Sequence, residues 1–233
     1  MPTRPPKKFR VKKLPLSGSE PTCTRAPYSL RSTVPRNNCY AYAVQHLTKT
    51  GPSFKLQPGN LSGLQGTDFD LETCHPALKR VVRDLLVSKK GYKVDMDSPC
   101  KKGYGKIALL LSKNMDFHFL RQNKDVVYPM EPGDTLASVA RKFRVPRSAV
   151  TRLSGTKVRV VGAGVWSHKR GTAFAPTLYD ARGNLIFDPR RANFNYGSLN
   201  YTTVCSSFCV KQKPCSRSTQ KQKSRATHKK INH

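Results

Sequence analysis

The sequence predicts an α+β protein in which two helices precede an antiparallel sheet. Three observations favour this class. Apolar residues at helical spacing occur up to residue 89, and alternating apolar and polar residues typical of strands follow. About forty residues of a different pattern then separate two of these strands, 115–122 and 164–169. Without that intervening segment, the two strands would form an ordinary hairpin.

The two predicted helices have recognisable ends. The first covers residues 39–47 and follows Asn37 or Asn38, either of which can cap it. The second covers about 74–89 and ends before Gly91. Its apolar residues recur at helical spacing and form one face, which consists of Leu78, Val81, Val82, Leu85 and Leu86.

The predicted sheet consists of one continuous apolar strand, two alternating strands and a last short strand. Residues 107–112 form an apolar run, which is typical of a buried central strand. Residues 115–122 and 164–169 alternate, which indicates half-buried strands. A turn at 181–184 leads into a last short strand, 185–187.

The charge balance is the strongest global feature of the chain. There are 43 Lys and Arg against 13 Asp and Glu, a formal net charge of +30, and the isoelectric point is 10.3. Residues 1–13 and 211–233 contain basic and no acidic residues, and the body between them keeps about +16. Such a charge favours polyanionic partners: nucleic acid, an anionic polysaccharide or an acidic protein surface. We find no zinc-finger, helix-turn-helix or RNP pattern, so sequence-specific recognition of nucleic acid is not indicated.

No segment has the pattern of a membrane span or a secretory leader. The longest apolar run, 107–111, is too short to cross a bilayer. The N-terminal residues are basic and proline-rich, and no apolar stretch follows them. We therefore expect a protein that is neither membrane-spanning nor secreted by this route.

The cysteines form an odd set, which consists of Cys23, Cys39, Cys74, Cys100, Cys205, Cys209 and Cys215. In a chain without a leader this favours synthesis in a reducing compartment, with disulfides formed later in an assembled particle as an alternative. A zinc site from the last three cysteines with Cys74 and His75 is disfavoured because no C-x-x-C pair exists. We therefore expect no metal and no cofactor.

Residues 126–163 have the pattern of a separate small fold: strand, helix, helix and strand. A Pro-Gly turn precedes Asp134, which is the expected cap of a helix over about 136–143. Pro146 starts a second short helix, and 158–161 is the second strand.

This segment resembles the LysM module, whose hallmark is Pro-Gly-Asp-Thr-Leu followed by Ala-x-x-Phe, here within 132–143. The resemblance implies a βααβ fold that binds N-acetylglucosamine polymers such as peptidoglycan and chitin. It places glycan contacts in the loops 131–136 and 153–157, with the candidates Gly133, Asp134, Thr135, Leu136, Ser154 and Gly155. The shortened second loop and the basic character of this segment depart from the family and favour a scaffold or protein contact as the alternative.

Three residues outside the insert suggest a cysteine nucleophile with its base. Cys39 opens the first helix, where the helix N-terminus lowers the pKa of a thiol. His118 on the strand 115–122 can take the thiol proton. His168 on the neighbouring strand can hold that imidazole in one tautomer, and Asp188 is a less favoured third residue.

The order and placement of these residues resemble the papain-fold cysteine hydrolases of the NlpC type. The resemblance covers roughly 35–125 and 164–210 and implies cleavage of an amide in cell-wall peptides. Asn38-Cys39-Tyr40-Ala41 departs from the family's Asp-Cys-Ser-Gly, so an inactive frame is the alternative. The predicted organisation is a basic arm 1–22, a discontinuous body 23–125 and 164–210, the insert 126–163 and a basic tail 211–233.

The motifs 116–122, 166–169 and 184–190 also resemble a small family from bacteria and from large DNA viruses of the chlorovirus type. With the basic charge, this resemblance implies a minor structural protein of the virion, made in the host cytoplasm, whose arms contact capsid proteins. The alternative function is an active cysteine peptidase or amidase whose LysM-like insert holds the glycan strand. A third hypothesis is nucleic-acid packaging through the basic tails.

Overall fold

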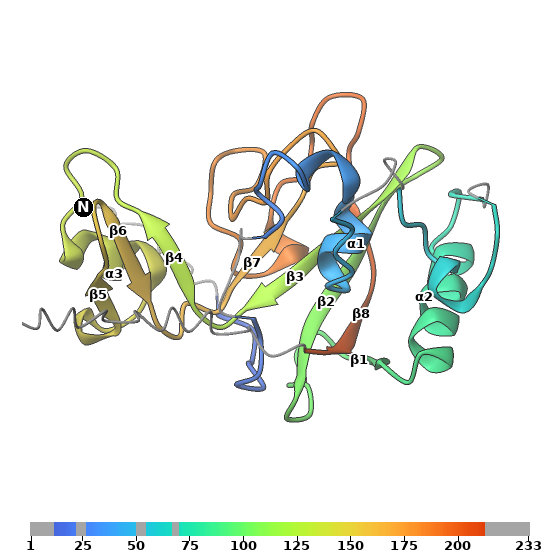
Figure 1. Ribbon diagram of the computed structural model, residues 1–233, viewed down its shortest axis with the longest axis horizontal. Coiled ribbons are helices and arrows are strands. Elements are labelled where there is room, and N and C mark those ends of the chain that lie inside the picture. Colours follow the sequence, from blue (N-terminus) through green and yellow to red (C-terminus); the bar gives the residue numbers. More distant parts are fainter. Residues whose placement is uncertain (1–11, 22–26, 50–54, 67–69, 213–233) are drawn as a thin grey trace, which may run out of the picture.

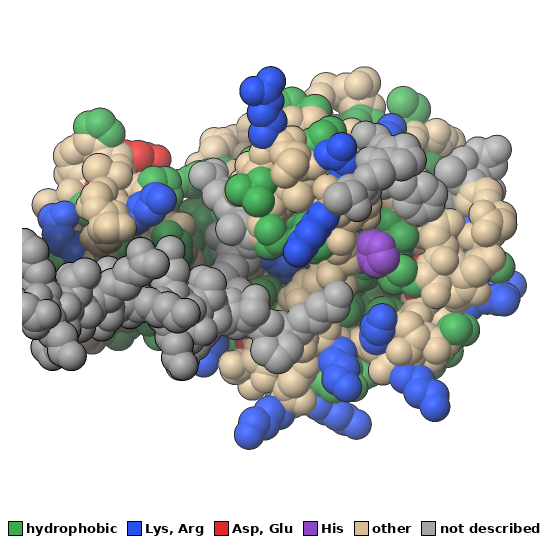
Figure 2. All heavy atoms as spheres, viewed as in Figure 1, with side chains coloured by type: hydrophobic (Ala, Val, Ile, Leu, Met, Phe, Trp, Pro, Cys, Tyr) green, Lys and Arg blue, Asp and Glu red, His purple; other side chains and the backbone are tan. Residues whose placement is uncertain are grey.

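The computed structural model describes residues 12–21, 27–49, 55–66 and 70–212. These residues form a larger lobe around a five-stranded antiparallel sheet and a smaller lobe around a three-stranded one (Figure 1). Two helices precede the first strand, and every strand pair in the described residues is antiparallel, so the predicted α+β class is confirmed. The basic stretches 1–11 and 213–233 lie outside the described residues. Figure 2 shows Lys and Arg side chains spread over both lobes of this face, with few acidic ones.

The larger sheet has the strand order β1-β8-β2-β3-β7 and the smaller one β4-β6-β5. The strands of the larger sheet are β1 (Gly91–Val94), β2 (Tyr104–Ser112), β3 (Asp116–Asn123), β7 (Val165–His168) and β8 (Thr203–Lys211). Those of the smaller sheet are β4 (Val126–Pro129), β5 (Val150–Arg152) and β6 (Lys157–Val160). The helices are α1 (Cys39–Ala43), α2 (His75–Val87) and α3 (Leu136–Phe143), with 3-10 turns at Val34–Arg36, Asn60–Ser62, Arg147–Ala149 and Pro189–Arg191.

The interrupted strand pair is present as predicted. β3 and β7 are antiparallel neighbours, from Leu120 opposite His168 to Asn123 opposite Val165. The predicted strand 107–112 is the buried inner part of β2, between β8 and β3. The segment 185–187 makes a single bridge, between Leu185 and Tyr179, and is not a strand.

α1 is shorter than the predicted helix 39–47. The side chain of Asn38 caps it as predicted, since its oxygen accepts the N–H of Ala41 at 3.0 Å. The helix ends in a Schellman turn: Gln45 has a φ of 55° and the N–H of His46 donates to the carbonyl of Ala41. Glutamine rarely takes this left-handed position, so no local pattern indicates that the helix ends early.

A buried carboxylate joins α1, α2 and the loop between them. Asp84 of α2 is fully buried and accepts the hydroxyl of Tyr40 at 2.7 Å, the N–H of Gly59 at 2.7 Å and the N–H of Ser62 at 2.8 Å. Asp84→Ala leaves all three donors without an acceptor, so we expect the free energy of unfolding to fall by about 3 kcal/mol. Urea denaturation measures this, with Asp84→Asn, which keeps an acceptor oxygen, as the milder control. A loss under about 1 kcal/mol in the alanine variant contradicts the assigned role.

The insert departs from the predicted βααβ order in two ways. The second helix is only the 3-10 turn Arg147–Ala149, and the chain then forms a third strand, β5, paired with β6. The cap of α3 is Thr135 rather than Asp134, because Thr135 has the extended backbone of an N-cap and exchanges hydrogen bonds with Ser138. The carboxylate of Asp134 instead accepts hydrogen bonds from Glu131 N–H, Tyr128 and Ser138.

The insert packs firmly against the larger lobe. Its buried residues, among them Tyr128, Val139 and Phe143, share one apolar core with Leu178 and Phe187 of the larger lobe. The described part of the N-terminal arm lies along the same junction. There Lys13 Nζ donates to the carbonyl of Gly162 at 3.2 Å, and Gln122 Nε2 donates to that of Leu14 at 3.1 Å. The orientation of the insert is therefore set by apolar packing and by the arm.

Two disulfides fasten β8 to the rest of the larger lobe. Cys74–Cys205 joins it to the start of α2, and Cys100–Cys209 joins it to the loop before β2. The zinc alternative therefore fails, since three of its cysteines are oxidised and Cys215 lies outside the described residues. In the described ranges, no group of three or more His, Cys, Asp or Glu side chains could hold a metal ion. None of the described helices has the length and apolar character needed to cross a membrane.

Candidate active site

Cys39 lies beside an open stretch of the β3 edge. β7 pairs with β3 only from Leu120 onward, so the backbone at 117–119 is not covered by that strand. The Sγ atom of Cys39 lies 4.0 Å from the carbonyl oxygen of Phe117 in this stretch. The start of α1 therefore holds the thiol next to the part of β3 that β7 does not pair with.

His118 and His168 lie on adjacent strands and are joined ring to ring. His118 Nε2 is 2.9 Å from His168 Nδ1, and His168 Nε2 is 2.9 Å from the carbonyl oxygen of Tyr179. A carbonyl only accepts hydrogen bonds, so His168 carries its proton on Nε2 and its Nδ1 accepts from His118. In the neutral pair this leaves the lone pair of His118 on Nδ1. The series thus fixes which nitrogen of His118 can act as a base.

Burial keeps both imidazoles neutral at pH 7. Burial lowers the pKa of His168 from 6.5 to about 4, and it lowers that of His118 well below its usual value. For His118, the neighbouring His168 and the positive charge of Arg170 lower the pKa further. A neutral His118 is in the protonation state that a general base requires.

The expectation of a low thiol pKa at Cys39 is wrong. Burial of the side chain, which is 6% exposed, and the carboxylate of Asp116 raise its pKa to about 12. α1 has only five residues, so its N-terminus offers little compensating charge. The resting state is consequently a neutral thiol and a neutral imidazole rather than a thiolate–imidazolium pair.

Cys39 and His118 line one cavity of about 570 Å³. Asp116 lines it too and accepts the hydroxyl of Tyr201 at 2.8 Å, while the Tyr201 ring lies 4.9 Å from that of His118. The other lining residues are Asn38, Lys55, Gln57, Phe117, residues 170–174, Tyr196 and Leu199. His168 is fully buried and supports His118 without lining the cavity. The structure thus brings the three predicted residues together, two at the cavity wall and one behind it.

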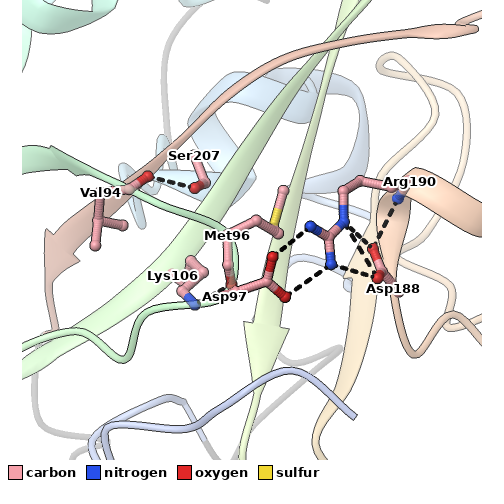
Figure 3. Close-up of polar contacts among 7 residues, drawn as sticks. All are labelled: Val94, Met96, Asp97, Lys106, Asp188, Arg190 and Ser207. Atoms are coloured by element: carbon pink, nitrogen blue, oxygen red, sulfur yellow. Dashed lines mark hydrogen bonds and ion pairs between the residues drawn. The ribbon is translucent and has the colours of Figure 1, made fainter. Parts of the chain in front are cut away.

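Asp188, the less favoured third residue, serves a different purpose. Its carboxylate binds the guanidinium of Arg190 at 2.7 Å, and the same guanidinium binds Asp97 at 2.6 Å (Figure 3). Close by, Lys106 Nζ donates to the carbonyl of Met96 at 2.6 Å. These contacts join the loop after β1 to the segment before β8 and leave Asp188 with a structural role.

Some residues of the site were missed at the sequence level. Asp116 is two residues before His118 on β3, so strand periodicity alone could have placed it on the same face. Arg170 and Tyr201 reach the cavity from loops, which carry no periodicity. Tyr179 acts through its backbone carbonyl, and no side-chain pattern could have indicated that.

Five of the six predicted glycan-binding residues lie on two loops of the insert, and the sixth, Leu136, is the first residue of α3. The loops are joined where the N–H of Met130 donates to the carbonyl of Thr156 at 2.9 Å. Ser154 and Gly155 are exposed, and Gly133 turns with a φ of 84°. Leu136 packs against the core of the insert, so its side chain is less available to a ligand than the others.

This arrangement suits acyl transfer to a cysteine. A neutral His118 can accept the thiol proton during attack and return it to a leaving group, while His168 accepts the Nε2–H of His118 throughout.

No family model, curated protein or solved structure matches this chain. The likeness to NlpC hydrolases, LysM modules and viral proteins therefore stays a prediction.

Proposed function

We propose that the protein is a cysteine hydrolase that cleaves an amide in cell-wall peptides. One observation carries the proposal: Cys39 and His118 line the same cavity, and His118 is held in a single tautomer by His168 and the Tyr179 carbonyl. Burying two hydrogen-bonded histidines lowers the stability of the fold in acid. In return, the arrangement gives His118 a lone pair on one defined nitrogen, as a general base requires.

The chemistry begins with the thiol protonated. Cys39 Sγ attacks the acyl carbon while His118 Nδ1 takes the thiol proton, and the charged ring keeps its Nε2–H hydrogen bond to His168. The tetrahedral intermediate collapses as His118 gives its proton to the leaving amine. Water then attacks the thioester with His118 again as base, which releases the acid and restores the thiol.

The test is hydrolysis of peptidoglycan stem peptides by the purified full chain. Cys39→Ala removes the nucleophile and His118→Gln removes the base, so each is expected to lower kcat/KM by at least about 1000-fold. The matched control is His75→Gln, because His75 is exposed at the start of α2 and should not affect the rate. Equal rates for native protein and Cys39→Ala would overturn the proposal.

The second candidate is the minor structural protein of a large DNA virus virion. The burial of Cys39 and its raised thiol pKa favour it, because an inactive frame needs no accessible nucleophile. In this proposal the protein resides in the virion and contacts capsid proteins through its basic arms. It predicts that Cys39 resists iodoacetamide from pH 5 to 9 and that no wall peptide is cleaved.

Nucleic-acid packaging through the tails depends on residues outside the described ranges.

A further inference from the structure

The two disulfides that hold β8 differ in how easily a dissolved reagent reaches them. Cys209 is fully buried, since β1 and β2 pair with β8 on either side of it, and its partner Cys100 is 6% exposed. Cys205 and Cys74 are both partly exposed. A reagent can therefore reach the bridge Cys74–Cys205 in the folded protein, whereas the sheet shields the bridge Cys100–Cys209.

Cys205 is exposed because the pairing of β8 is incomplete where it lies. β1 pairs with β8 no further than Ser207, so residues 203–206 have no partner in β1. On the other side, the register with β2 shifts between Leu109 and Leu110, and Cys205 is the residue that the ladder skips. Such a bulge redirects a side chain out of the regular alternation of the strand. The bulge thus turns Cys205 toward the start of α2, where it meets Cys74.

A cavity of about 570 Å³ lies at this open end of β8 and has Cys205 in its wall. Lys93 and Asp95 line it as well, and both are exposed. Arg190 gives the wall a rigid part, since ion pairs with two carboxylates hold its guanidinium (Figure 3). The other lining residues are Val94, Met96, Val204, Ser206 and Ser207. Cys74 does not line the cavity, so the sulfur of Cys205 is the one that a ligand meets.

Cys74 is placed as the leaving group of an exchange reaction. It is the N-cap residue of α2, a helix of 13 residues, and its side chain makes no cap hydrogen bond. The N-terminus of a helix of this length carries a partial positive charge that stabilises a thiolate. Exchange is faster when the departing sulfur forms the more stable anion. Access and leaving-group stability therefore favour the same direction: attack on Cys205 and departure of Cys74.

The charges at the cavity indicate which class of thiol fits. Lys93 offers a positive charge to a carboxylate, and Asp95 offers a negative charge to an ammonium group. Amino acids and short peptides carry both groups. A cavity of this size accommodates a ligand of a few residues.

We propose that Cys205 is a site of thiol–disulfide exchange, at which a small thiol of the amino-acid or short-peptide class becomes attached. The incoming thiolate forms a bond to Cys205 Sγ and breaks the Cys74–Cys205 bond, and Cys74 leaves as a thiolate that takes a proton from water. The incoming sulfur is oxidised as that of Cys74 is reduced, so the exchange needs no further oxidant. Attachment removes the cross-link between β8 and α2 and leaves the bridge Cys100–Cys209 in place. This chemistry is independent of the proposed hydrolase function.

The first experiment treats the purified full chain, with both bridges formed, with reduced glutathione at pH 8 in the absence of oxygen. N-ethylmaleimide traps the free thiols, and mass spectrometry of the peptides locates each modification. We expect glutathione on Cys205 and N-ethylmaleimide on Cys74. The bridge Cys100–Cys209 should open at least about 100-fold more slowly, because the sheet must open first. Equal opening rates would overturn the proposal, as would glutathione on Cys74 with Cys205 as the free thiol.

A second measurement does not depend on how long the adduct survives attack by Cys74. In Cys74→Ala, Cys205 is a free thiol, and oxidised glutathione should attach to it with release of one glutathione thiolate. Cys100→Ala is the matched variant, because it leaves Cys209 as a free but buried thiol. We expect attachment to Cys209 to be at least about 10-fold slower. An unreactive Cys205 in Cys74→Ala would contradict the proposed site.

The assigned ligand class is tested through Lys93. Lys93→Gln should slow the attack of glutathione about 3-fold, the effect of one exposed ion pair, and should leave the rate with uncharged 2-mercaptoethanol unchanged. Lys157→Gln, which removes the same charge from exposed β6 of the smaller lobe, should alter neither rate. If Lys93→Gln changed both rates equally, or neither, the cavity would not select a charged thiol and the assigned class would be wrong.

Discussion

Loss of either disulfide is expected to lower the free energy of unfolding by about 4 kcal/mol. Cys74–Cys205 spans 131 residues and Cys100–Cys209 spans 109, so each closes a long loop in the unfolded chain. Closing loops of this length removes much of the conformational freedom of the unfolded state. Both bridges also hold β8, which lies between β1 and β2 in the larger sheet. The pairs Cys74→Ala/Cys205→Ala and Cys100→Ala/Cys209→Ala remove them one at a time.

Urea denaturation with and without dithiothreitol measures this effect. The native protein should lose stability on reduction, and the variant lacking all four cysteines should be indifferent to the reductant. Cys39→Ala is the matched control, because Cys39 is unpaired and its removal should leave the response to the reductant intact. A loss under about 1 kcal/mol on full reduction would mean that the bridges add little to packing already present.

Acidification from pH 6.5 to pH 4 is expected to destabilise the fold by about 3 kcal/mol or more, because of the buried histidine pair. The pKa of His168 falls from 6.5 to about 4 on folding, and that of His118 falls well below its usual value. In this window the unfolded chain binds protons that the folded chain excludes. The stabilising effect of the neutral pair is therefore complete above pH 6.5 and is lost as the pH falls. Asp116 acts in the opposite direction, because burial raises its pKa and favours its protonation in the folded state.

The double variant His118→Gln/His168→Gln isolates this effect, since glutamine keeps hydrogen-bonding groups but does not titrate. Its unfolding free energy should vary less between pH 7 and pH 4 than that of the native protein. His75→Gln, at an exposed position, should keep the native pH dependence. If the unfolding free energy fell equally steeply with pH in the double variant and in the native protein, other groups would be the cause of the acid sensitivity.

Much of the larger lobe could be predicted because its signals are local. The helical spacing of Val81 and Leu85 predicts α2, and the alternation around His118 predicts β3 and its face. β8 was missed, because its small polar residues and cysteines do not form a clear alternating pattern. It becomes a strand through pairing with β2, about ninety residues earlier in the chain, and a local pattern contains no such information.

The sequence predicted that Cys39, His118 and His168 come together, but it did not predict the raised pKa of the thiol. Strand alternation and a cap before Cys39 were enough to select the cysteine and both histidines. The raised pKa of Cys39 depends on tertiary burial and on the carboxylate of Asp116. Strand alternation can place Asp116 on the face of His118, but it does not show that the thiol is buried beside it. The early end of α1 at Gln45 likewise depends on packing rather than on a glycine.

The shared core of the two lobes makes the insert a support for the hydrogen-bonded histidine pair. Leu178 and Phe187, which the insert covers, flank the segment that contains Tyr179. The carbonyl of Tyr179 determines which nitrogen of His168 carries hydrogen, and hence which nitrogen of His118 is free. A chain shortened by residues 126–163 would lose the apolar partners that hold this carbonyl in place. The insert is thus a structural part of the site formed by Cys39, His118 and His168, whatever its own loops bind.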